Sequence, residues 1–363
     1  KQIFEEGQEA YAVIGNDNQV VELLDKIDTS YFRRKPLTTE YEFLDKQEVK
    51  SVIKGKKYSV KALNAKKISD IPDSLLAIAD GILAFDTLKF DKKTLTKLKN
   101  CKVLVRVGVG FDNVDLKFAK KIGIPVCNVP DYGVDEVADY AISSILFTNR
   151  NFLSYIENTK KRKWIRESNS CLRLDGKTLG IIGLGRIGSA LAIRAKVFKL
   201  NVIFYDPYVE SGKDKVLGIK RVNSIKELAM NSDFISIHCP LTKETNNIID
   251  KKFFSFTKKN LILINSARGN NVNLDDLRIA LKKNKLKCAV LDVLPVEPLS
   301  DSHKLLKDYL IQETYLKNKL FITPHSAFFS NQSIIEIREK AAQEAKNVIE
   351  NHKSQNCINN FYE

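Results

Sequence analysis

The sequence lacks an apolar run long enough to span a membrane, and its N-terminal residues lack the pattern of a secretory signal peptide. Paired cysteine spacing is also missing. The six cysteines, at positions 101, 127, 171, 239, 288 and 357, lie mostly in or beside apolar segments, as buried free thiols do. These absences argue against a membrane protein and against a disulfide-linked secreted protein. They predict a cytoplasmic protein with reduced cysteines.

Positive charge, in contrast, is abundant, with a formal net charge of +15. The lysines are spread in short groups such as Lys56–Lys57 and Lys282–Lys283, and only Lys160–Lys163 forms a compact basic run. A solvated helix end explains that run better than a nucleic-acid site, so nucleic-acid binding is the minor alternative. A general positive field would also attract an anionic substrate and a dinucleotide.

A glycine-rich turn gives the strongest local signal. Thr178–Ile182 is a short apolar run typical of a buried parallel strand, and Gly183, Gly185 and Gly188 follow in the spacing G-x-G-x-x-G before a helical pattern. Such a turn directs backbone N–H groups at a pyrophosphate. A second strand ends at Asp206, 18 residues after Gly188, where a carboxylate can accept hydrogen bonds from ribose hydroxyls and repel a 2′-phosphate. The segment predicts binding of NAD rather than NADP.

The remaining chain is long enough for two domains, each with its own core. Strand-like and helix-like segments alternate from residue 37 to residue 127, which predicts a small parallel sheet covered by helices. The strand candidates there are Tyr41–Leu44, Ser59–Ala62, Gly81–Phe85, Val103–Val107 and Pro125–Val129. After a break, Val134–Phe147 forms a long helix with an apolar face, and the alternation resumes at Thr178. A final helix over Gln332–Glu350 is expected to return to the first domain.

The predicted fold is therefore α/β, with two Rossmann-like or flavodoxin-like parallel-sheet domains and the cofactor domain inserted into the substrate domain. The expected bounds are 1–34 for an N-terminal extension, which contains a helical-looking Val20–Ile27, 35–128 plus 326–363 for the substrate domain, and 129–325 for the NAD-binding domain.

Three chemically useful side chains follow strands of the predicted cofactor domain. His325 follows Phe321–Pro324, Arg268 follows the strand Leu261–Asn265, and Glu297 follows a strand ending at Val293. In open α/β sheets the carboxyl edge of the strands is where ligands bind. Taken singly, each residue could also have a purely structural role. His325 could be a packed histidine, Arg268 a surface arginine bound to a carbonyl, and Glu297 an exposed loop glutamate. His238, at another strand end, is more simply explained as a packed histidine than as part of a cofactor pocket.

Taken together, the three side chains suit hydride chemistry on a 2-oxo acid. The arginine would bind a carboxylate at two points and polarise the neighbouring carbonyl. The histidine would exchange a proton with the carbonyl oxygen, and the glutamate would orient the imidazole and raise its pKa. No metal site is predicted.

Several longer motifs, from about residue 36 to residue 350, carry a specific resemblance. The chain resembles the D-isomer-specific 2-hydroxyacid dehydrogenase family, and within it is most similar to the C-terminal-binding-protein branch. The matching segments are Val105–Asn113, Val126–Pro130, Gly180–Gly188, Phe204–Tyr208, Ser266–Gly269, Asp292–Pro298 and Thr323–His325.

The resemblance implies roles for individual residues. Arg268, Glu297 and His325 match the catalytic residues. Val107, Gly108 and Val109 match the loop whose backbone amides bind the substrate carboxylate, and Val109 is also expected to contact the cofactor. Arg106 matches an arginine of the substrate pocket. The other cofactor positions are Gly183, Gly185, Arg186, Ile187 and Gly188 at the pyrophosphate, Asp206 at the ribose, Cys239, Pro240 and Thr245 on the adenosine side, and Ser266, Ala267 and Asp292 at the nicotinamide. It also implies a homodimer in which the long helix after the first hinge grips the partner.

Three segments depart from the family pattern. Asn270–Asn273 follows the arginine where the family usually has Gly and then Asp, and residues 299–319 form a longer connection than usual, suited to a lid or a contact surface. Phe328 stands where the corepressor branch often has a substrate-facing tryptophan, and an aromatic there still fits a hydrophobic substrate side chain.

Two functions of different classes follow. The first is an NAD-dependent oxidoreductase interconverting a small 2-oxo acid and a D-2-hydroxy acid. The alternative is an NAD(H)-sensing scaffold whose output is partner binding, as in the corepressor branch. A scaffold need not keep three converging side chains, which favours the enzyme.

Overall fold

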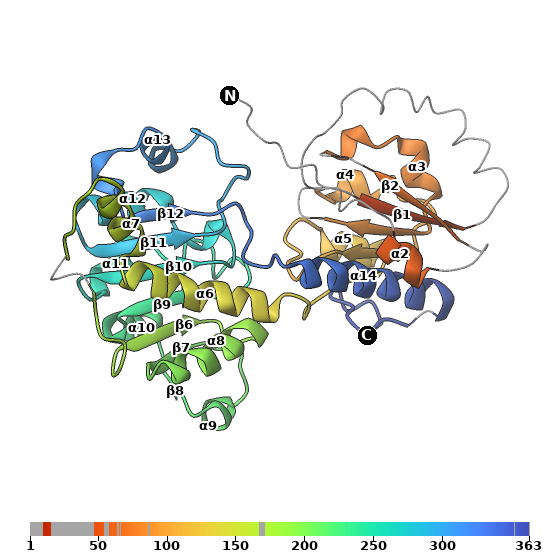
Figure 1. Cartoon of the computed structure of the whole chain (residues 1–363). Coiled ribbons are helices and arrows are strands. Elements are labelled where there is room, and N and C mark those ends of the chain that lie inside the picture. Colours follow the sequence, from red (N-terminus) through yellow and green to blue (C-terminus); the bar gives the residue numbers. More distant parts are fainter. Residues whose placement is uncertain are drawn as a thin grey trace. The chain divides into compact units, whose positions relative to one another are not determined.

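The computed structural model describes residues 10–15, 47–53, 58–63, 65, 67–85, 88–166, 171–351 and 353–362. The chain divides into two compact units (Figure 1). The first consists of Lys1–Tyr132 with Asn331–Glu363, and the second of Gly133–Ser330. The second unit is thus inserted in the chain between the two parts of the first.

The first unit contains a five-stranded sheet in the order β2-β1-β3-β4-β5. The strands are β1 (Ala10–Gly15), β2 (Tyr58–Leu63), β3 (Gly81–Ala84), β4 (Val103–Arg106) and β5 (Val126–Asn128). β3, β4 and β5 are parallel, as the alternation of segments predicted, whereas β1 is antiparallel to both of its neighbours.

β1 is the main departure from the expected first unit. The sequence pattern predicts an N-terminal extension over residues 10–15, but these residues lie between β2 and β3, so the sheet is mixed and not wholly parallel. The short apolar run Tyr11–Ile14 carries no local sign of the two distant strands with which it pairs. The candidates Val20–Ile27 and Tyr41–Leu44 lie outside the described residues.

Short helices and one long helix surround this sheet: α2 (Gln47–Val52), α3 (Asp73–Ile78), α4 (Lys92–Leu95), α5 (Leu116–Lys121), α14 (Asn331–Asn351) and the 3-10 turn η2 (Ile68–Asp70). α14 buries Ile337, Ala341, Ala345 and Val348, spaced three or four residues apart, and contacts α2, β3 and β4. The final helix therefore completes the first unit, as predicted.

The second unit contains a seven-stranded sheet in the order β12-β11-β10-β9-β6-β7-β8, with every neighbouring pair parallel. The strands are β6 (Thr178–Ile182), β7 (Asn201–Tyr205), β8 (Lys220–Arg221), β9 (Phe234–Ile237), β10 (Leu261–Asn265), β11 (Leu286–Leu291) and β12 (Leu320–Ile322). The predicted α/β fold with parallel sheets is confirmed.

Helices cover both faces of this sheet, so the central strands are buried on both sides. On one face Ile181 and Ile262 pack with α6 (Val134–Asn149) and α8 (Arg186–Val197). On the other, Ile235 and Leu263 pack with α10 (Ile225–Asn231), α11 (Lys251–Phe256) and α12 (Leu274–Lys282). The remaining helical segments are α7 (Phe152–Lys160), α9 (Lys213–Leu217), α13 (Lys304–Leu310), η3 (Gly269–Asn271) and η4 (Thr314–Leu316).

The long connection 299–319 is anchored to the body of the second unit. Asp308 of α13 accepts hydrogen bonds from Arg278 Nε at 2.6 Å and from the Tyr315 hydroxyl at 2.5 Å. The Lys282 ammonium lies 4.7 Å from the centre of the Tyr315 ring. These contacts fix the connection to α12.

Two further findings concern the chain as a whole. None of the helices in the described ranges has the length and apolarity needed to cross a membrane. All six cysteines are free thiols.

Candidate active site

The three glycines of the predicted dinucleotide-binding turn differ in how much space surrounds each Cα atom. Gly183 has a φ of +90°, and a side chain there would place Cβ 2.7 Å from the backbone nitrogen of Cys239. A Cβ on Gly188 would lie 2.2 Å from the carbonyl oxygen of Gly183, so this glycine lets α8 pack closely on the turn. A Cβ on Gly185 would meet nothing within 4 Å. The turn therefore has a tightly packed side and, at Gly185, an open one.

Asp206 links this turn to the end of β7. Its Oδ2 accepts from the Leu184 N–H at 2.8 Å and its Oδ1 accepts from the Tyr208 N–H at 2.9 Å. Because each carboxylate oxygen has more than one lone pair, both can still accept from a ribose hydroxyl. α8 begins at Arg186, with Ile187 in its first turn, so its N-terminal N–H groups and helix dipole lie next to Gly185.

The segment after β9 forms a compact loop. The Thr245 hydroxyl donates to Pro240 O at 2.6 Å and accepts from the Thr242 N–H at 2.7 Å. Cys239 is buried below this loop. Burial lowers the pKa of His238 to about 4, so its ring is neutral near pH 7, and its Nε2 lies 2.8 Å from Ser236 Oγ. His238 is thus a packed strand-end histidine, as the simpler interpretation held.

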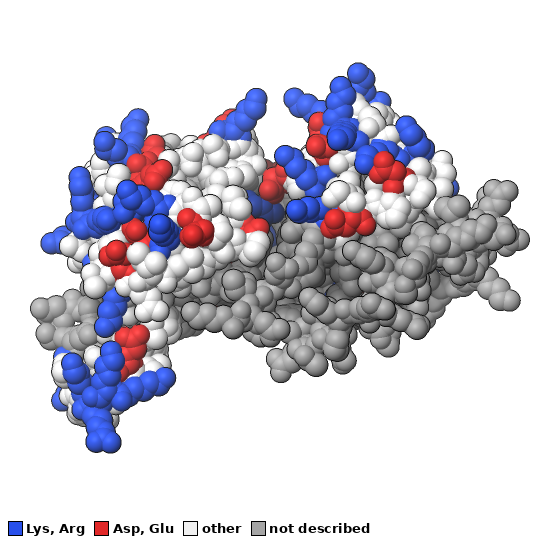
Figure 2. All heavy atoms as spheres, turned by 90° about the horizontal axis from the view of Figure 1, so that it is seen from above, with Lys and Arg blue, Asp and Glu red and all other residues white. Residues whose placement is uncertain are grey.

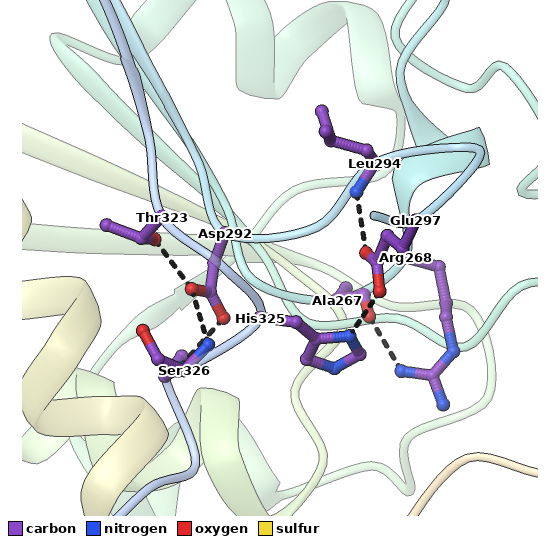
Figure 3. A network of polar contacts seen from close by, with 9 residues as sticks. Ala267, Arg268, Asp292, Leu294, Glu297, Thr323, His325 and Ser326 are labelled. Carbon is purple, nitrogen blue, oxygen red and sulfur yellow. Dashed lines mark hydrogen bonds and ion pairs between the residues drawn. The ribbon is translucent and has the colours of Figure 1, made fainter. Parts of the chain in front are cut away.

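His325 and Glu297 form the central polar contact (Figure 3). His325 Nδ1 lies 2.8 Å from Glu297 Oε2, and Glu297 Oε1 accepts from the Leu294 N–H at 2.8 Å. The side chains of His325 and Glu297 keep 28% and 35% of their surface exposed, so both remain accessible. The two residues follow β12 and β11, which are adjacent parallel strands, and therefore meet at one edge of the sheet.

Arg268 follows β10, the next strand of the same sheet. Its Nη1 donates to Ala267 O at 2.8 Å, and Figure 3 shows its guanidinium on the same side of the site as Glu297. Burial raises the pKa of the Glu297 carboxyl. This effect is outweighed by the His325 hydrogen bond and charge, the Leu294 N–H and the Arg268 charge, so the pKa of Glu297 lies below its usual value. Glu297 is therefore an ionised acceptor at neutral pH.

The backbone of His325 is held by Asp292. His325 has a φ of +50°, and its N–H donates to the carbonyl oxygen of Asp292 at 2.8 Å. The Asp292 carboxylate accepts from the Thr323 hydroxyl at 2.6 Å and from the N–H groups of Ser326 and Ala327 at 2.9 and 2.8 Å. The Tyr140 hydroxyl of α6 lies 2.6 Å from the Thr323 hydroxyl. Asp292 is 1% exposed, so this network supports the left-handed turn from below.

Two other predicted residues lie near these groups. The ring of Phe328 meets the ring of His325 edge to face, with centroids 6.0 Å apart. The Ser266 hydroxyl is buried and has no hydrogen-bond partner within the described part of the chain. An unpaired buried hydroxyl costs free energy, so it is a ready contact for a bound group.

The predicted substrate residues Arg106, Val107 and Gly108 follow β4 in the first unit. Arg106 is 2% exposed and donates from Nη1 to Val107 O at 2.5 Å. The N–H groups of Val107 and Gly108 donate to Ala84 O and Arg106 O at 2.8 and 2.9 Å. Val109, the next residue, is 37% exposed. Binding of a carboxylate by the first two amides would replace these internal hydrogen bonds, and the role of this loop stays a prediction.

The sequence did not single out the residues that position Arg268. Asn271 is fully buried, accepts from the Arg268 N–H at 3.0 Å and donates to Thr245 O at 3.1 Å. Asn265 donates to Arg268 O at 2.9 Å. A Cβ on Gly269 would lie 1.9 Å from the Leu294 carbonyl carbon, so the two loops touch backbone to backbone. The only available signal was the departure of Asn270–Asn273 from the family pattern.

The family model described as "D-isomer specific 2-hydroxyacid dehydrogenase, NAD binding domain" matches residues 142–327. The chain is 34% identical over 281 residues to a D-3-phosphoglycerate dehydrogenase of Methanocaldococcus jannaschii, covering 77% of this chain and 52% of the relative. It is 36% identical over 306 residues to C-terminal-binding protein 1 of Caenorhabditis elegans, covering 82% and 41%. The chain thus spans about half the length of these curated relatives or less.

Among solved structures, the chain is similar to D-lactate dehydrogenase from Aquifex aeolicus in complex with NAD and lactic acid. The two share 32% identity with a TM-score of 0.70, over 78% of this chain and 86% of the other. The resemblance seen in the sequence motifs, including the C-terminal-binding-protein branch, is confirmed.

Proposed function

Because this chain belongs to the D-isomer specific 2-hydroxyacid dehydrogenase family, we propose that it is an NAD-dependent oxidoreductase that interconverts a 2-oxo acid and a D-2-hydroxy acid. The observation that carries the proposal is the 2.8 Å contact between His325 and Glu297 at the sheet edge that also bears Arg268. An acid–base group, an orienting carboxylate and a fixed cation are what reduction of a carbonyl beside a carboxylate requires.

NAD is the cofactor of the matched domain family, and bound NAD supplies or takes up the hydride. The residues present fit it. The open Gly185 and the start of α8, with Gly183, Arg186, Ile187 and Gly188, would hold the pyrophosphate, and Asp206 would hold the ribose. The adenosine side would meet Cys239, Pro240 and Thr245. The unpaired Ser266 hydroxyl suits the nicotinamide end, together with Ala267 and Asp292.

The proton is moved by His325. The ionised Glu297 can only accept a hydrogen bond, so Nδ1 of His325 must carry a proton. Nε2 of His325 is then left to face the substrate. In reduction, the imidazolium donates its Nε2 proton to the substrate oxygen; in oxidation, neutral Nε2 removes that proton. Arg268 binds the carboxylate and polarises the carbonyl.

The substrate is proposed to be a small 2-oxo or 2-hydroxy acid. Phe328 contacts the catalytic ring and would contact the substrate side chain, which favours an apolar group there. Arg106, Val107 and Gly108 are the proposed substrate residues of the first unit.

A homodimer is proposed as the functional assembly. α6, α7 and the residues after α7 expose large apolar side chains: Phe147 at 37%, Phe152 at 51%, Ile156 at 45%, Trp164 at 92% and Ile165 at 57%. Apolar side chains gathered along neighbouring elements mark an interaction surface. They belong to the helix expected to contact a partner and to its continuation. We propose a cytoplasmic location for this dimer, in line with the reduced cysteines.

The two alternatives gain less support. A scaffold has no need for the His325–Glu297 contact, nor for the buried network that holds it. For nucleic-acid binding, Figure 2 shows lysine and arginine side chains at many separate places on the described surface of one face, most with acidic side chains nearby. Mixed charge of this kind gives no continuous track for a phosphate backbone.

The proposal is tested by following NADH absorbance with a panel of 2-oxo acids, including glyoxylate, pyruvate, hydroxypyruvate and 3-phosphohydroxypyruvate, and by determining the configuration of the product. Oxidation of NADH with formation of the D-hydroxy acid is expected for at least one member. NADH binding without turnover of any member would favour the scaffold.

A further inference from the structure

A pair of cysteines in the first unit lies outside the proposed active site. Cys127 is in β5, and Cys357 belongs to the segment that follows α14 and returns to β5. The two residues form an antiparallel bridge, flanked by hydrogen bonds from Ile358 N to Val126 O at 2.8 Å and from Asn128 N to Asn356 O at 3.2 Å. The chain thus brings together two thiols that are 230 residues apart (357 − 127).

The bridge is of the type that brings opposite side chains closest together. Because its two hydrogen bonds join the residues on either side, Cys127 and Cys357 form a non-hydrogen-bonded pair, in which Cα atoms are about 4.5 Å apart and side chains are closest. This separation lies inside the range of about 4.4–6.8 Å seen across disulfides. Both thiols are free in the structure. Cys127 Sγ lies 3.2 Å from Ser354 Oγ, and Cys357 Sγ donates to Asn359 Oδ1 at 3.2 Å.

The two thiols differ in access and in acidity. Cys127 is fully buried, whereas Cys357 is half-buried. The hydrogen bond from Cys127 lowers the pKa of the Cys357 thiol, against the opposing effect of burial, and backbone N–H groups add to it. The hydrogen bond with Cys357 and burial raise the pKa of Cys127. Cys357 is therefore the nucleophile that solvent reaches, and Cys127 is the resolving thiol behind it.

We propose that Cys127 and Cys357 form a redox modification site that takes low-molecular-weight disulfides such as glutathione disulfide. The Cys357 thiolate attacks one sulfur of glutathione disulfide, forms a mixed disulfide and releases one glutathione thiolate. Cys127 Sγ then attacks Cys357 Sγ, and the Cys127 proton passes to the departing glutathione thiolate. The Cys127–Cys357 bond forms, the second glutathione leaves, and the two cysteines have given two electrons to glutathione disulfide.

The bond would fix the C-terminal segment to the edge of the sheet. That segment is now held by Glu344, which accepts from the N–H groups of Gln355 and Asn356 at 3.0 and 3.1 Å, and by Asn359, which donates to Ile124 O at 2.9 Å. Next to Cys127, Asn128 donates from its side chain to Val109 O at 2.7 Å. The cross-link therefore lies one residue from Asn128, whose side chain hydrogen-bonds to the loop that follows β4.

The test uses the full-length protein, fully reduced and then incubated with glutathione disulfide. Free thiols are alkylated, and peptides are mapped by mass spectrometry with and without dithiothreitol. We expect a Cys127–Cys357 linked peptide that dithiothreitol removes, together with a rise of several degrees in Tm, because a long loop is closed in the unfolded chain. Cys357→Ser should abolish both effects, whereas Cys171→Ser, at another half-buried thiol, should leave them unchanged.

Two results would overturn the proposal. One is a stable glutathione adduct on Cys357 while Cys127 stays a free thiol. The other is full alkylation of both cysteines in folded wild-type protein after the incubation. Neither measurement depends on NADH turnover, so this test stands apart from the proposed enzymatic activity.

Discussion

His325 Nδ1 lies 2.8 Å from Glu297 Oε2, although the two residues are 28 positions apart and follow different strands. The contact orients the imidazole and fixes which nitrogen faces Glu297. The same carboxylate accepts from the Leu294 N–H, so its own position is set by the backbone. The orientation of His325 therefore depends on Glu297 as an acceptor that stays ionised.

Replacing Glu297 by glutamine should lower kcat by about 10²-fold or more, within the range that general acid–base catalysis contributes. The amide can donate to Nδ1 and so stabilise the wrong tautomer. The pH dependence of kcat should shift as well, while NADH affinity, measured by fluorescence titration, should change less than twofold. An unchanged pH profile would show that Glu297 does not act through His325.

The stability difference between wild type and Glu297→Gln should depend on pH. The pKa of Glu297 lies below its usual 4.5 in the folded protein, so the folded state binds this proton more weakly than the unfolded state. The resulting stability is present above about pH 4.5 and is lost as the pH falls through the lower folded pKa. The Tm difference between wild type and Glu297→Gln should shrink as the pH falls below about 4.5. A difference that grows below that pH would refute this assignment.

Asn271 should act as a positioning residue for Arg268. Asn271→Ala leaves the Arg268 N–H and Thr245 O without their partner, which costs about 1–3 kcal/mol of unfolding free energy. Denaturant unfolding measures that loss. We expect KM for the 2-oxo acid to rise, because Arg268 binds its carboxylate, and Asn271→Asp, which keeps the acceptor for the Arg268 N–H, should restore part of the binding.

Asn270→Ala is the matched control, because Asn270 is exposed in the same turn. Its stability and its KM should equal those of the wild type. Equal KM values for Asn271→Ala and Asn270→Ala would confine Asn271 to a structural role.

If the exposed apolar side chains of α7 and of the residues after it form the dimer interface, a charged substitution there should dissociate the dimer. Ile156→Asp should shift the protein to monomer in light scattering, whereas Val216→Asp, at a residue 84% exposed on α9, should not. Trp164 is the single tryptophan and is 92% exposed, so its fluorescence reports burial directly. Its emission should move to shorter wavelength as the protein concentration rises. Emission that is independent of concentration in a monomeric wild type would contradict the proposed dimer.

The sequence predicted those features that depend on local patterns. The glycine turn, the buried strands and the positions of Arg268, Glu297 and His325 after strand ends can all be recognised within short segments. β1 could not be placed, because its partners lie near residues 60 and 82 and the short strand carries no sign of either. The Tyr140–Thr323 contact joins residues 183 positions apart. The role of Asn271 is visible only from its hydrogen bonds to Arg268 and to Thr245, which lies in another loop.

The most direct measurement compares wild type and His325→Ala with a 2-oxo acid that the wild type reduces. NADH oxidation is followed by stopped-flow absorbance, and NADH affinity is titrated separately. We expect His325→Ala to lose turnover by about 10²- to 10⁴-fold while its Kd for NADH stays within twofold of the wild-type value. Turnover close to that of the wild type, or a large loss of NADH affinity, would contradict the role of His325 as the proton donor and acceptor.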